Sequence, residues 1–230
     1  MSFLCVPIRA RNMRQLRTLV RRAARDADIL EIWMDSLPAA LQKNPATVRA
    51  LTGKKLLAVN KPVREKGEWK GTEKDRVDLL KKCADAGFDY IDIGVDTDVR
   101  LIAGLRENMR RPAKLIVSFH DFLKTPDVRE LRRIVGKGAK LGADIVKIVT
   151  FAGKREDNIT IAELLVEHRS KKSPALVAHA MGALGIPSRL LAPIFGSHIV
   201  YAALDGGKKS APGQLTVKEY KRFASFFRSR

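Results

Sequence analysis

Short apolar runs alternate with longer amphipathic stretches along the whole chain. The short runs are rich in valine, isoleucine and leucine and are bounded by turn residues, which is typical of buried strands, whereas the longer stretches repeat apolar positions with helical spacing. The pattern predicts strands at 3–9, 29–35, 56–60, 90–95, 113–119, 143–149, 175–181 and 199–204. It predicts helices at 12–27, 45–51, 74–86, 98–108, 127–141, 159–167, 187–191 and 217–227, the last beginning at a capping box of Thr216 and Glu219.

Eight consecutive strand–helix units favour one fold. Strands separated by helices become parallel strands joined by right-handed crossovers, and eight of them close into a barrel. We therefore expect an α/β protein with a (β/α)8 TIM barrel, in which residues 1–230 form a single domain. The alternative, an open doubly wound sheet, requires a glycine-rich turn after the first strand, and residues 8–11 (Ile-Arg-Ala-Arg) contain no glycine.

The composition is that of a globular protein from a reducing compartment. Of its 230 residues 45% are hydrophobic, which suits one compact core. Cys5 and Cys83 are far apart in apolar segments, which argues against a disulfide framework or a thiolate metal site. No stretch reaches the roughly 18 apolar residues of a membrane span, and the first residues lack the pattern of a signal peptide. We expect a soluble, cytoplasmic protein.

The chain is strongly basic. Its 44 lysine and arginine residues against 25 aspartate and glutamate residues give a net charge of +19. Such a field concentrates anions, whether a small carboxylate or a polynucleotide. The cations follow helical spacing, as at Arg14, Arg17, Arg21 and Arg25, and are not interleaved with aromatic residues as in a stacking platform for nucleic acid. A solvated basic surface is therefore the stronger interpretation, and nucleic-acid binding the weaker one.

The predicted strand at 143–149 carries a lysine among β-branched residues. Burial of an ammonium group is costly and lowers its pKa, so Lys147 should be either paired or chemically active. A lysine with a lowered pKa is an amine nucleophile that forms imines with ketones and aldehydes. The alternative is a lysine at a strand end whose head group reaches water.

Catalytic side chains of a TIM barrel gather where the strands end, at one mouth. His120 ends the strand that neighbours the strand of Lys147, and an imidazole exchanges protons near neutral pH. We interpret His120 as a general acid/base and His168, His179 and His198 as structural. The other polar residues at or near strand ends are Arg9, Glu31, Asp35, Asn60, Lys61, Glu65 and the loop 210–214.

Four motifs lie in order at the ends of the later strands. They are 118–122 (Ser-Phe-His-Asp-Phe), 143–147 (Ala-Asp-Ile-Val-Lys), 181–182 (Met-Gly) with Gly185 and Ser188-Arg189, and 210–214 (Ser-Ala-Pro-Gly-Gln). In this order and at these positions they resemble the motifs of the type I 3-dehydroquinate dehydratases of the shikimate pathway. One such motif is only suggestive, but four on the expected strands are specific, and the resemblance runs along essentially the whole chain.

The resemblance implies a hydro-lyase that converts 3-dehydroquinate to 3-dehydroshikimate and water. It implies that Lys147 forms an imine with the substrate ketone, that His120 transfers the protons and that Glu65 orients the imidazole. It also implies a homodimer, a lid at 210–214, and substrate contacts from Glu31, Lys61, Met181, Arg189, Ser210 and Gln214, with Arg189 on the substrate carboxylate.

The residues alone leave simpler interpretations open at three of these positions. Glu65 could be a solvated loop carboxylate, Arg189 one more surface arginine, and 212–213 a plain turn. No cluster with metal-ligand spacing and no phosphate-binding glycine loop is present in the sequence, so we expect no cofactor.

The chain also departs from this family. Trp33 stands two residues after Glu31, and Lys61 ends the third strand, where the family has arginines; residues 65–67 read Glu-Lys-Gly instead of Glu-Gly-Gly. Because tryptophan has no charge and lysine lacks the forked contact of arginine, substrate affinity and identity are the properties most affected. We expect the positive field to compensate in part by capturing an anionic substrate. Two other functions remain: another imine-forming lyase of the class I aldolase kind, and a non-catalytic barrel that binds nucleic acid.

Overall fold

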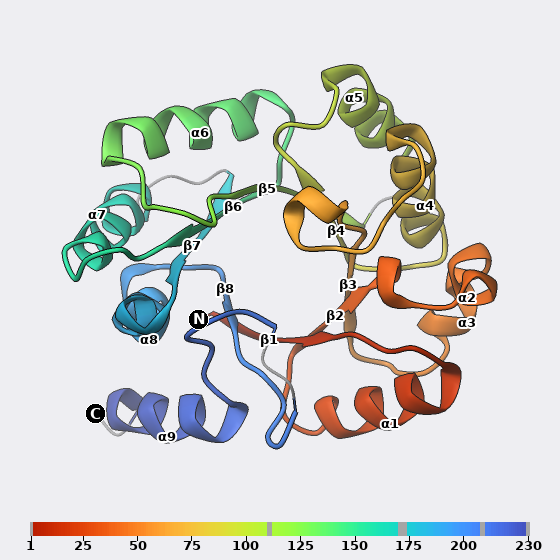
Figure 1. The fold of residues 1–230 in the computed structure, drawn as a ribbon, viewed down its shortest axis with the longest axis horizontal. Helices are drawn as coiled ribbons and strands as arrows, with labels where there is room; N and C mark the ends of the chain where they lie inside the picture. The colour runs from red at the N-terminus through yellow and green to blue at the C-terminus, as the bar shows by residue number, and fades with distance from the viewer. Residues whose placement is uncertain (1, 110–111, 170–173, 208–209, 229–230) are drawn as a thin grey trace.

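Parallel strands alternate with helices to form a TIM barrel in the computed structural model, which describes residues 2–109, 112–169, 174–207 and 210–228 (Figure 1). The strands are β1 (Phe3–Ile8), β2 (Ile29–Trp33), β3 (Lys55–Val59), β4 (Tyr90–Gly94), β5 (Lys114–His120), β6 (Ile145–Phe151), β7 (Ala175–Met181) and β8 (Ile199–Tyr201). The helices are α1 (Met13–Ala23), α2 (Ala39–Lys43), α3 (Pro45–Arg49), α4 (Glu73–Asp85), α5 (Val99–Asn108), α6 (Val128–Lys140), α7 (Asp157–His168), α8 (Ile186–Phe195) and α9 (Val217–Arg228).

The sheet runs in the order β7-β6-β5-β4-β3-β2-β1-β8, with every pairing parallel. Within the described residues β7 and β8 form no ladder, but the N–H of His198 donates to the carbonyl of Leu176 across this seam at 2.7 Å. The barrel is therefore nearly closed. This confirms the predicted (β/α)8 fold and excludes the open doubly wound sheet, in which the strand order would reverse.

Polar residues at the ends of the elements fix where they begin. Asp28, Asp89 and Asp144 precede β2, β4 and β6, and the carboxylate of each accepts a hydrogen bond of 2.8–2.9 Å from a backbone N–H of the preceding strand. The predicted capping box is confirmed, because Thr216 Oγ1 accepts from the N–H of Glu219 while Glu219 Oε2 accepts from that of Thr216. The aspartates thus tie the starts of β2, β4 and β6 to the strand before each of them, and the capping box marks the start of α9.

Several observed elements differ from the predicted ones; helix α1, for example, ends at Ala23 and not at residue 27. Helix α2 was not predicted; it occupies Ala39–Lys43, directly before α3. Helix α8 continues through Pro193 to Phe195, although a proline inside a helical pattern usually ends it. Strand β8 ends at Tyr201, earlier than expected, because Ala203 leaves the barrel sheet and instead pairs with Thr216.

Apolar side chains fill two separate spaces. A large cluster lies between the sheet and the surrounding helices, and a smaller one fills the barrel interior beneath the mouth with Cys5, Ile29, Leu57, Val59, Tyr90, Ile116, Ile145, Val177 and Ile199. The interior cluster forms the apolar floor of the barrel, and the polar side chains at the strand ends lie above it. Among the described residues, no helix is long and apolar enough to cross a membrane.

Candidate active site

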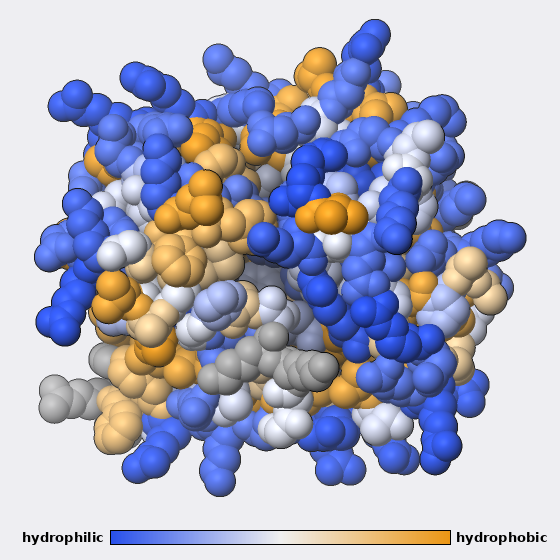
Figure 2. Space-filling view, in the orientation of Figure 1, coloured by the Kyte–Doolittle hydropathy of each residue, from blue (hydrophilic) through white to orange (hydrophobic). Residues whose placement is uncertain are grey.

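A cavity of about 430 Å³ opens at the ends of the strands, where Figure 2 shows a hollow at the centre of the molecular face. Every site residue predicted from the sequence lines this cavity: Glu31, Lys61, Glu65, His120, Lys147, Met181, Arg189, Ser210 and Gln214. They come from β2, β5, β6, β7, α8 and the loops after β3 and β8. The barrel therefore brings together side chains that are up to 183 residues apart in the sequence.

Strand register places the two central residues side by side. Ser118 of β5 is the partner of Lys147 in β6, and His120 is the partner of Val149. Because side chains alternate along a strand, Ser118 and His120 face the barrel interior together, with His120 one step closer to the mouth. The imidazole thus lies above the lysine on the neighbouring strand.

Lys147 is paired and does not reach bulk water. The residue is 6% exposed, and its Nζ lies 3.2 Å from Asp92 Oδ2 and 3.4 Å from Glu31 Oε2. Burial by itself would lower the pKa of Lys147, but the Glu31 carboxylate, the Tyr201 hydroxyl and the Asp92 carboxylate together outweigh it and raise this pKa well above 10.5. The expectation of a lowered pKa is therefore wrong for this chain, and so is the alternative of a lysine whose head reaches solvent.

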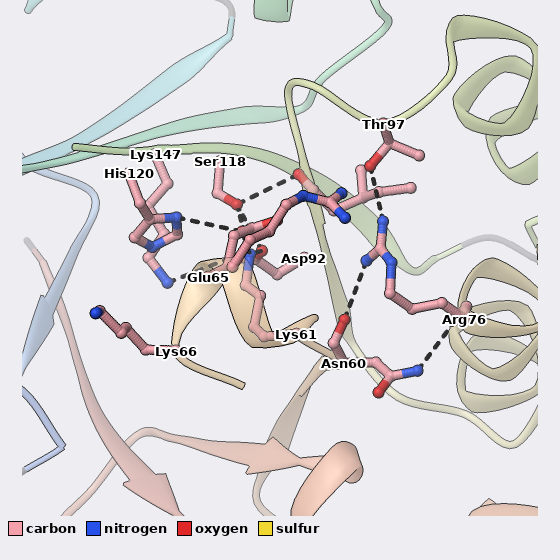
Figure 3. Close-up of polar contacts among 12 residues, drawn as sticks. Asn60, Lys61, Glu65, Lys66, Arg76, Asp92, Thr97, Ser118, His120 and Lys147 are labelled. Carbon is pink, nitrogen blue, oxygen red and sulfur yellow. Dashed lines mark hydrogen bonds and ion pairs between the residues drawn. The ribbon is translucent and has the colours of Figure 1, made fainter. Parts of the chain in front are cut away.

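A hydrogen-bonded network beside His120 joins the loop after β3 to β4, β5 and β6 (Figure 3). The ammonium of Lys61 donates to Asp92 Oδ1 at 2.7 Å, Ser118 Oγ at 2.9 Å and Glu65 Oε2 at 3.0 Å. Burial would raise the pKa of Asp92, but Lys61 and Lys147 outweigh it and hold this pKa well below its usual range. Asp92 therefore stays ionised and connects the two ammonium groups.

Asp92 and Ser118 belong to this network but were not predicted as site residues. A signal for Asp92 was available, because a carboxylate in the apolar run Tyr-Ile-Asp-Ile-Gly meets the same burial argument that singled out Lys147.

His120 is held as a neutral imidazole. Burial, followed by the nearby charges of Lys61 and Lys147, lowers its pKa well below 6.5. Its Nδ1 has no hydrogen-bond partner among the described residues and lies 3.6 Å from Glu65 Oε2, a distance too long for a hydrogen bond. Glu65 is thus placed beside the imidazole as predicted, but its hydrogen bond goes to Lys61.

Glu65 is not a solvated loop carboxylate. Its side chain is 17% exposed, and the loop after β3 turns it inward over the end of β4. A Cβ at Gly94 would lie 2.9 Å from Glu65 Oε1, so the glycine gives the carboxylate room. Asp35 fixes the same loop from outside the cavity by accepting from the backbone N–H groups of Lys61 and Glu68.

Trp33 and Arg9 form a stacked pair on the β1–β2 side of the cavity. The guanidinium of Arg9 lies 3.5 Å from the Trp33 ring centroid, and the Trp33 indole donates to Glu31 Oε1 at 2.9 Å. Arg9 also donates to the carbonyl of Lys66, while its buried Nε has no partner among the described residues. A cation therefore lies over the ring of Trp33, the residue found where the resembled family has an arginine.

Arg189 is a buried cation, not a surface arginine. It is 6% exposed in the first turn of α8, and within the described chain its Nε and Nη2 have no hydrogen-bond partner. Burial lowers its pKa to about 10, so it remains charged at neutral pH. Unpaired buried donors that face a cavity are suited to a bound anion.

The loop 210–214 is docked onto the end of β7 and is more than a plain turn. Gln214 Oε1 accepts from both the N–H and the hydroxyl of Ser210, at 2.8 and 3.0 Å. Gly213 has φ +72°, and a Cβ there would collide with the carbonyl oxygen of Gly182, whose N–H donates to the carbonyl of Pro212. The glycine thus permits close backbone contact that places Ser210 and Gln214 over the cavity.

Not every predicted mouth residue faces the cavity, and some polar residues that were not predicted as site residues do. Asn60 points to α4, where its amide donates to the carbonyl of Arg76 (Figure 3). His168 is structural as expected, because its Nε2 bonds the carbonyl of Pro174. His179, which was interpreted as structural, lines the cavity, and so does Tyr201. The signal for His179 was its position two residues before Met181, on the same face of β7.

Comparison with known proteins gives a consistent result along the whole chain. The family model described as Type I 3-dehydroquinase matches residues 4–228. A 3-dehydroquinate dehydratase of Methanococcus maripaludis is 33% identical over 222 residues, covering 95% of this chain and 96% of that protein. The 3-dehydroquinate dehydratase of Methanosarcina barkeri is 34% identical over 216 residues, covering 88% and 86%.

Solved structures agree. The crystal structure of 3-dehydroquinate dehydratase from Geobacillus kaustophilus has a TM-score of 0.91 at 26% identity, covering 100% of this chain and 93% of that one. The type I 3-dehydroquinate dehydratase of Clostridium difficile, solved with covalently modified comenic acid, has a TM-score of 0.86 at 26% identity, covering 98% and 92%.

Proposed function

The chain belongs to the type I 3-dehydroquinase family, and from this premise we propose that it is a 3-dehydroquinate dehydratase, a hydro-lyase that converts 3-dehydroquinate to 3-dehydroshikimate and water. The observation that carries the proposal is the content of one cavity, which a buried lysine, a neutral imidazole and an unpaired guanidinium line together. In this proposal residues 1–230 act as one catalytic domain.

Lys147 forms an imine with the substrate ketone. The reaction of a lysine ammonium with a ketone gives a protonated imine and water, and it moves two protons from nitrogen to oxygen without net uptake or release. Glu31 and Asp92 lie within 3.4 Å of Nζ and remain beside the cation when it becomes an iminium. These fixed carboxylates stabilise the positive charge in both states.

His120 transfers the protons at carbon and at the leaving hydroxyl. The iminium withdraws electrons and acidifies the adjacent C–H, and the neutral imidazole takes that proton to give an enamine. The resulting imidazolium returns the proton to the departing hydroxyl, which leaves as water while the conjugated iminium forms. Hydrolysis of this iminium releases 3-dehydroshikimate and restores Lys147. Glu65, 3.6 Å from Nδ1, stabilises the transient imidazolium.

The cations around the cavity bind the anionic, polyhydroxylated substrate. Arg189 takes the carboxylate, because its buried donors have no other partner in the described chain. Arg9, stacked on Trp33, supplies a cation on the side where the family's arginine is missing. Glu31, Lys61, Met181, Ser210 and Gln214 complete the substrate contacts, with 210–214 acting as a lid.

The two alternative functions explain fewer of these features. An aldolase-like lyase would share the imine of Lys147 but has no need of the docked loop that carries Ser210 and Gln214. A nucleic-acid-binding barrel would need neither the buried network nor a cavity at the strand ends with an unpaired arginine. The small anionic substrate is therefore the partner that we propose, without nucleic acid.

We further propose a cytoplasmic homodimer. Exposed apolar side chains lie on α7 and α8, where Ile159 is 67%, Val166 53% and Ile194 38% exposed. Figure 2 shows apolar side chains gathered on the side of the central hollow that carries these helices. A second copy of the chain would remove this surface from water. Light scattering of the purified protein tests this: a mass near twice 25.6 kDa supports a dimer, and a monomer mass contradicts it.

The decisive experiment mixes the protein with 3-dehydroquinate and follows the ultraviolet absorbance of the conjugated enone product. Parallel samples receive sodium borohydride, which reduces an imine to a stable amine, and peptide mass analysis then locates the added mass. We expect enone formation, inactivation by borohydride only when substrate is present, and the adduct on Lys147. An adduct without enone would mean an imine enzyme for a different substrate. The absence of both the enone and the adduct would contradict the proposed function.

A further inference from the structure

Tyr201 is a cavity residue that the proposed mechanism does not yet use. It ends β8, opposite Cys5 of β1, and its ring packs against the apolar floor of the barrel. Its hydroxyl oxygen is shielded from solvent and, within the described residues, makes no hydrogen bond of normal geometry, although it lies near enough to Lys147 to help raise the pKa of that lysine. A buried phenol normally finds a partner, so this unsatisfied group points to one that is supplied by a ligand.

The phenol lies beside the reacting nitrogen. Lys147 Nζ is 4.6 Å from the Tyr201 ring centroid, and both residues line the cavity. The ring of His179 lies 5.8 Å from that of Tyr201 and forms the adjacent part of the wall. Tyr201 belongs to β8 and His120 to β5, so the two approach Lys147 from different strands of the barrel.

Imine formation needs a group that passes protons from nitrogen to oxygen. Two protons must move from the lysine nitrogen to the carbonyl oxygen before water can leave, and the two atoms are bonded to the same carbon. A direct transfer between them is strained, so a neighbouring group that both accepts and donates a proton lowers the barrier. A phenol does both through a single oxygen.

We propose that Tyr201 is a catalytic residue that relays protons from Lys147 Nζ to the substrate oxygen during imine formation, and in reverse during imine hydrolysis. When the nitrogen attacks, the phenol gives its proton to the oxygen and receives one from the nitrogen. A second exchange of the same kind lets the oxygen leave as water and the iminium form. The tyrosine ends each exchange as the phenol, and no proton is taken from or lost to solvent.

The assignment divides the chemistry between two groups. Burial raises the pKa of Tyr201 well above 10, so the hydroxyl keeps its proton at neutral pH until the nitrogen supplies another. His120 then remains a neutral base for the C–H step and need not also transfer protons to the oxygen of the substrate ketone. This inference rests on the proposed imine mechanism and adds to it a role for the β8 side of the cavity.

The test is the rate of imine formation in Tyr201→Phe, which retains the ring and its contact with Lys147 and removes only the hydroxyl. Enzyme in excess is mixed with 3-dehydroquinate, quenched with borohydride at increasing times, and the fraction of chain carrying the adduct is measured by mass spectrometry. We expect the rate to fall by about 10²-fold or more, the usual contribution of a positioned proton-transfer group. Tyr90→Phe, at the base of the barrel interior, is the matched control and should form the adduct at the wild-type rate.

The outcomes distinguish failure of the proposed role of Tyr201 from failure of the proposed imine mechanism. If the wild-type protein forms no adduct, the imine mechanism itself fails. If the wild-type protein forms the adduct and Tyr201→Phe forms it equally fast, Tyr201 is not a proton relay, whatever happens to overall turnover. Equal melting temperatures of Tyr201→Phe and Tyr90→Phe ensure that a slower adduct is not a folding defect.

Discussion

The two sides of the cavity differ in how their polar groups are satisfied before any ligand binds. On the β3–β6 side, Lys61, Asp92, Ser118 and Lys147 hold one another in a buried network, and among the described residues His120 Nδ1 is the catalytic atom left without a hydrogen bond there. On the β7–β8 side, Arg189 and Tyr201 have buried polar atoms without a partner in the described chain. The first side is preorganised by the protein, whereas the second is completed by the substrate.

The largest effect is expected on the preorganised side, at the nucleophile. Lys147→Ala should lower kcat by about 10⁴-fold or more, because the covalent intermediate cannot form without the amine. Lys114→Ala, at the opposite end of the neighbouring strand, is the control and should retain activity. The enone assay measures both. Substantial turnover by Lys147→Ala would refute the imine mechanism.

The next effect concerns the anion that joins the two ammonium groups. Asp92→Asn leaves Lys61 and Lys147 buried with less compensating charge, so we expect the free energy of unfolding to fall by about 3–5 kcal/mol. Asp26→Asn removes the carboxylate of the exposed pair with Lys221 and should cost less than about 1 kcal/mol. Urea denaturation of the two variants compares them. Equal losses of unfolding free energy in the two variants would show that burial does not determine how much an ion pair contributes to stability.

Arg189→Leu probes the unsatisfied side. Because the guanidinium has buried donors without partners, we expect the free energy of unfolding to stay the same or rise. Loss of a charge-assisted contact worth about 1.5–3 kcal/mol should at the same time raise KM by roughly 10- to 100-fold. Steady-state kinetics and denaturation measure the pair of effects. A destabilised variant with unchanged KM would contradict the contrast between the two sides.

A smaller effect is expected from the whole field of the chain. With a net charge of +19, capture of an anionic substrate should weaken as salt screens the field, so kcat/KM should fall several-fold while kcat stays constant. Assays between about 20 and 200 mM sodium chloride test this. A flat profile would confine recognition to the contacts of Arg189 and its neighbours.

The smallest expected effect is that His120 and His179 do not take up a proton as the pH falls to 6.5. Burial lowers the pKa values of His120 and His179 well below 6.5, so their ring signals in NMR spectra should not shift between about pH 8 and pH 6.5. The unfolded chain protonates these histidines near pH 6.5, and the folded chain does not. The free energy of unfolding should therefore fall as the pH drops below 6.5. His120→Gln and His179→Gln assign the signals, and a midpoint at or above 6.5 would contradict the placement of the rings.

Much of the fold and part of the site could be read along the chain. The repeated strand–helix pattern predicted the barrel, and the burial argument selected Lys147 correctly as a paired or reactive lysine. The same argument applied to Asp92 would have found it. The direction of the Lys147 pKa shift could not be predicted, because it depends on carboxylates 55 and 116 residues away in the sequence.

The sequence by itself determined the order of the elements, the mouth at which they end and the motifs of the family, since these follow from local periodicity and residue type. Only the tertiary structure decided which polar atoms pair and which stay free: Lys61 with Asp92, Arg9 on Trp33, and Arg189 and Tyr201 facing the cavity. The physical reason is that pairing and desolvation depend on distances between separate strands, and closure of the barrel sets those distances.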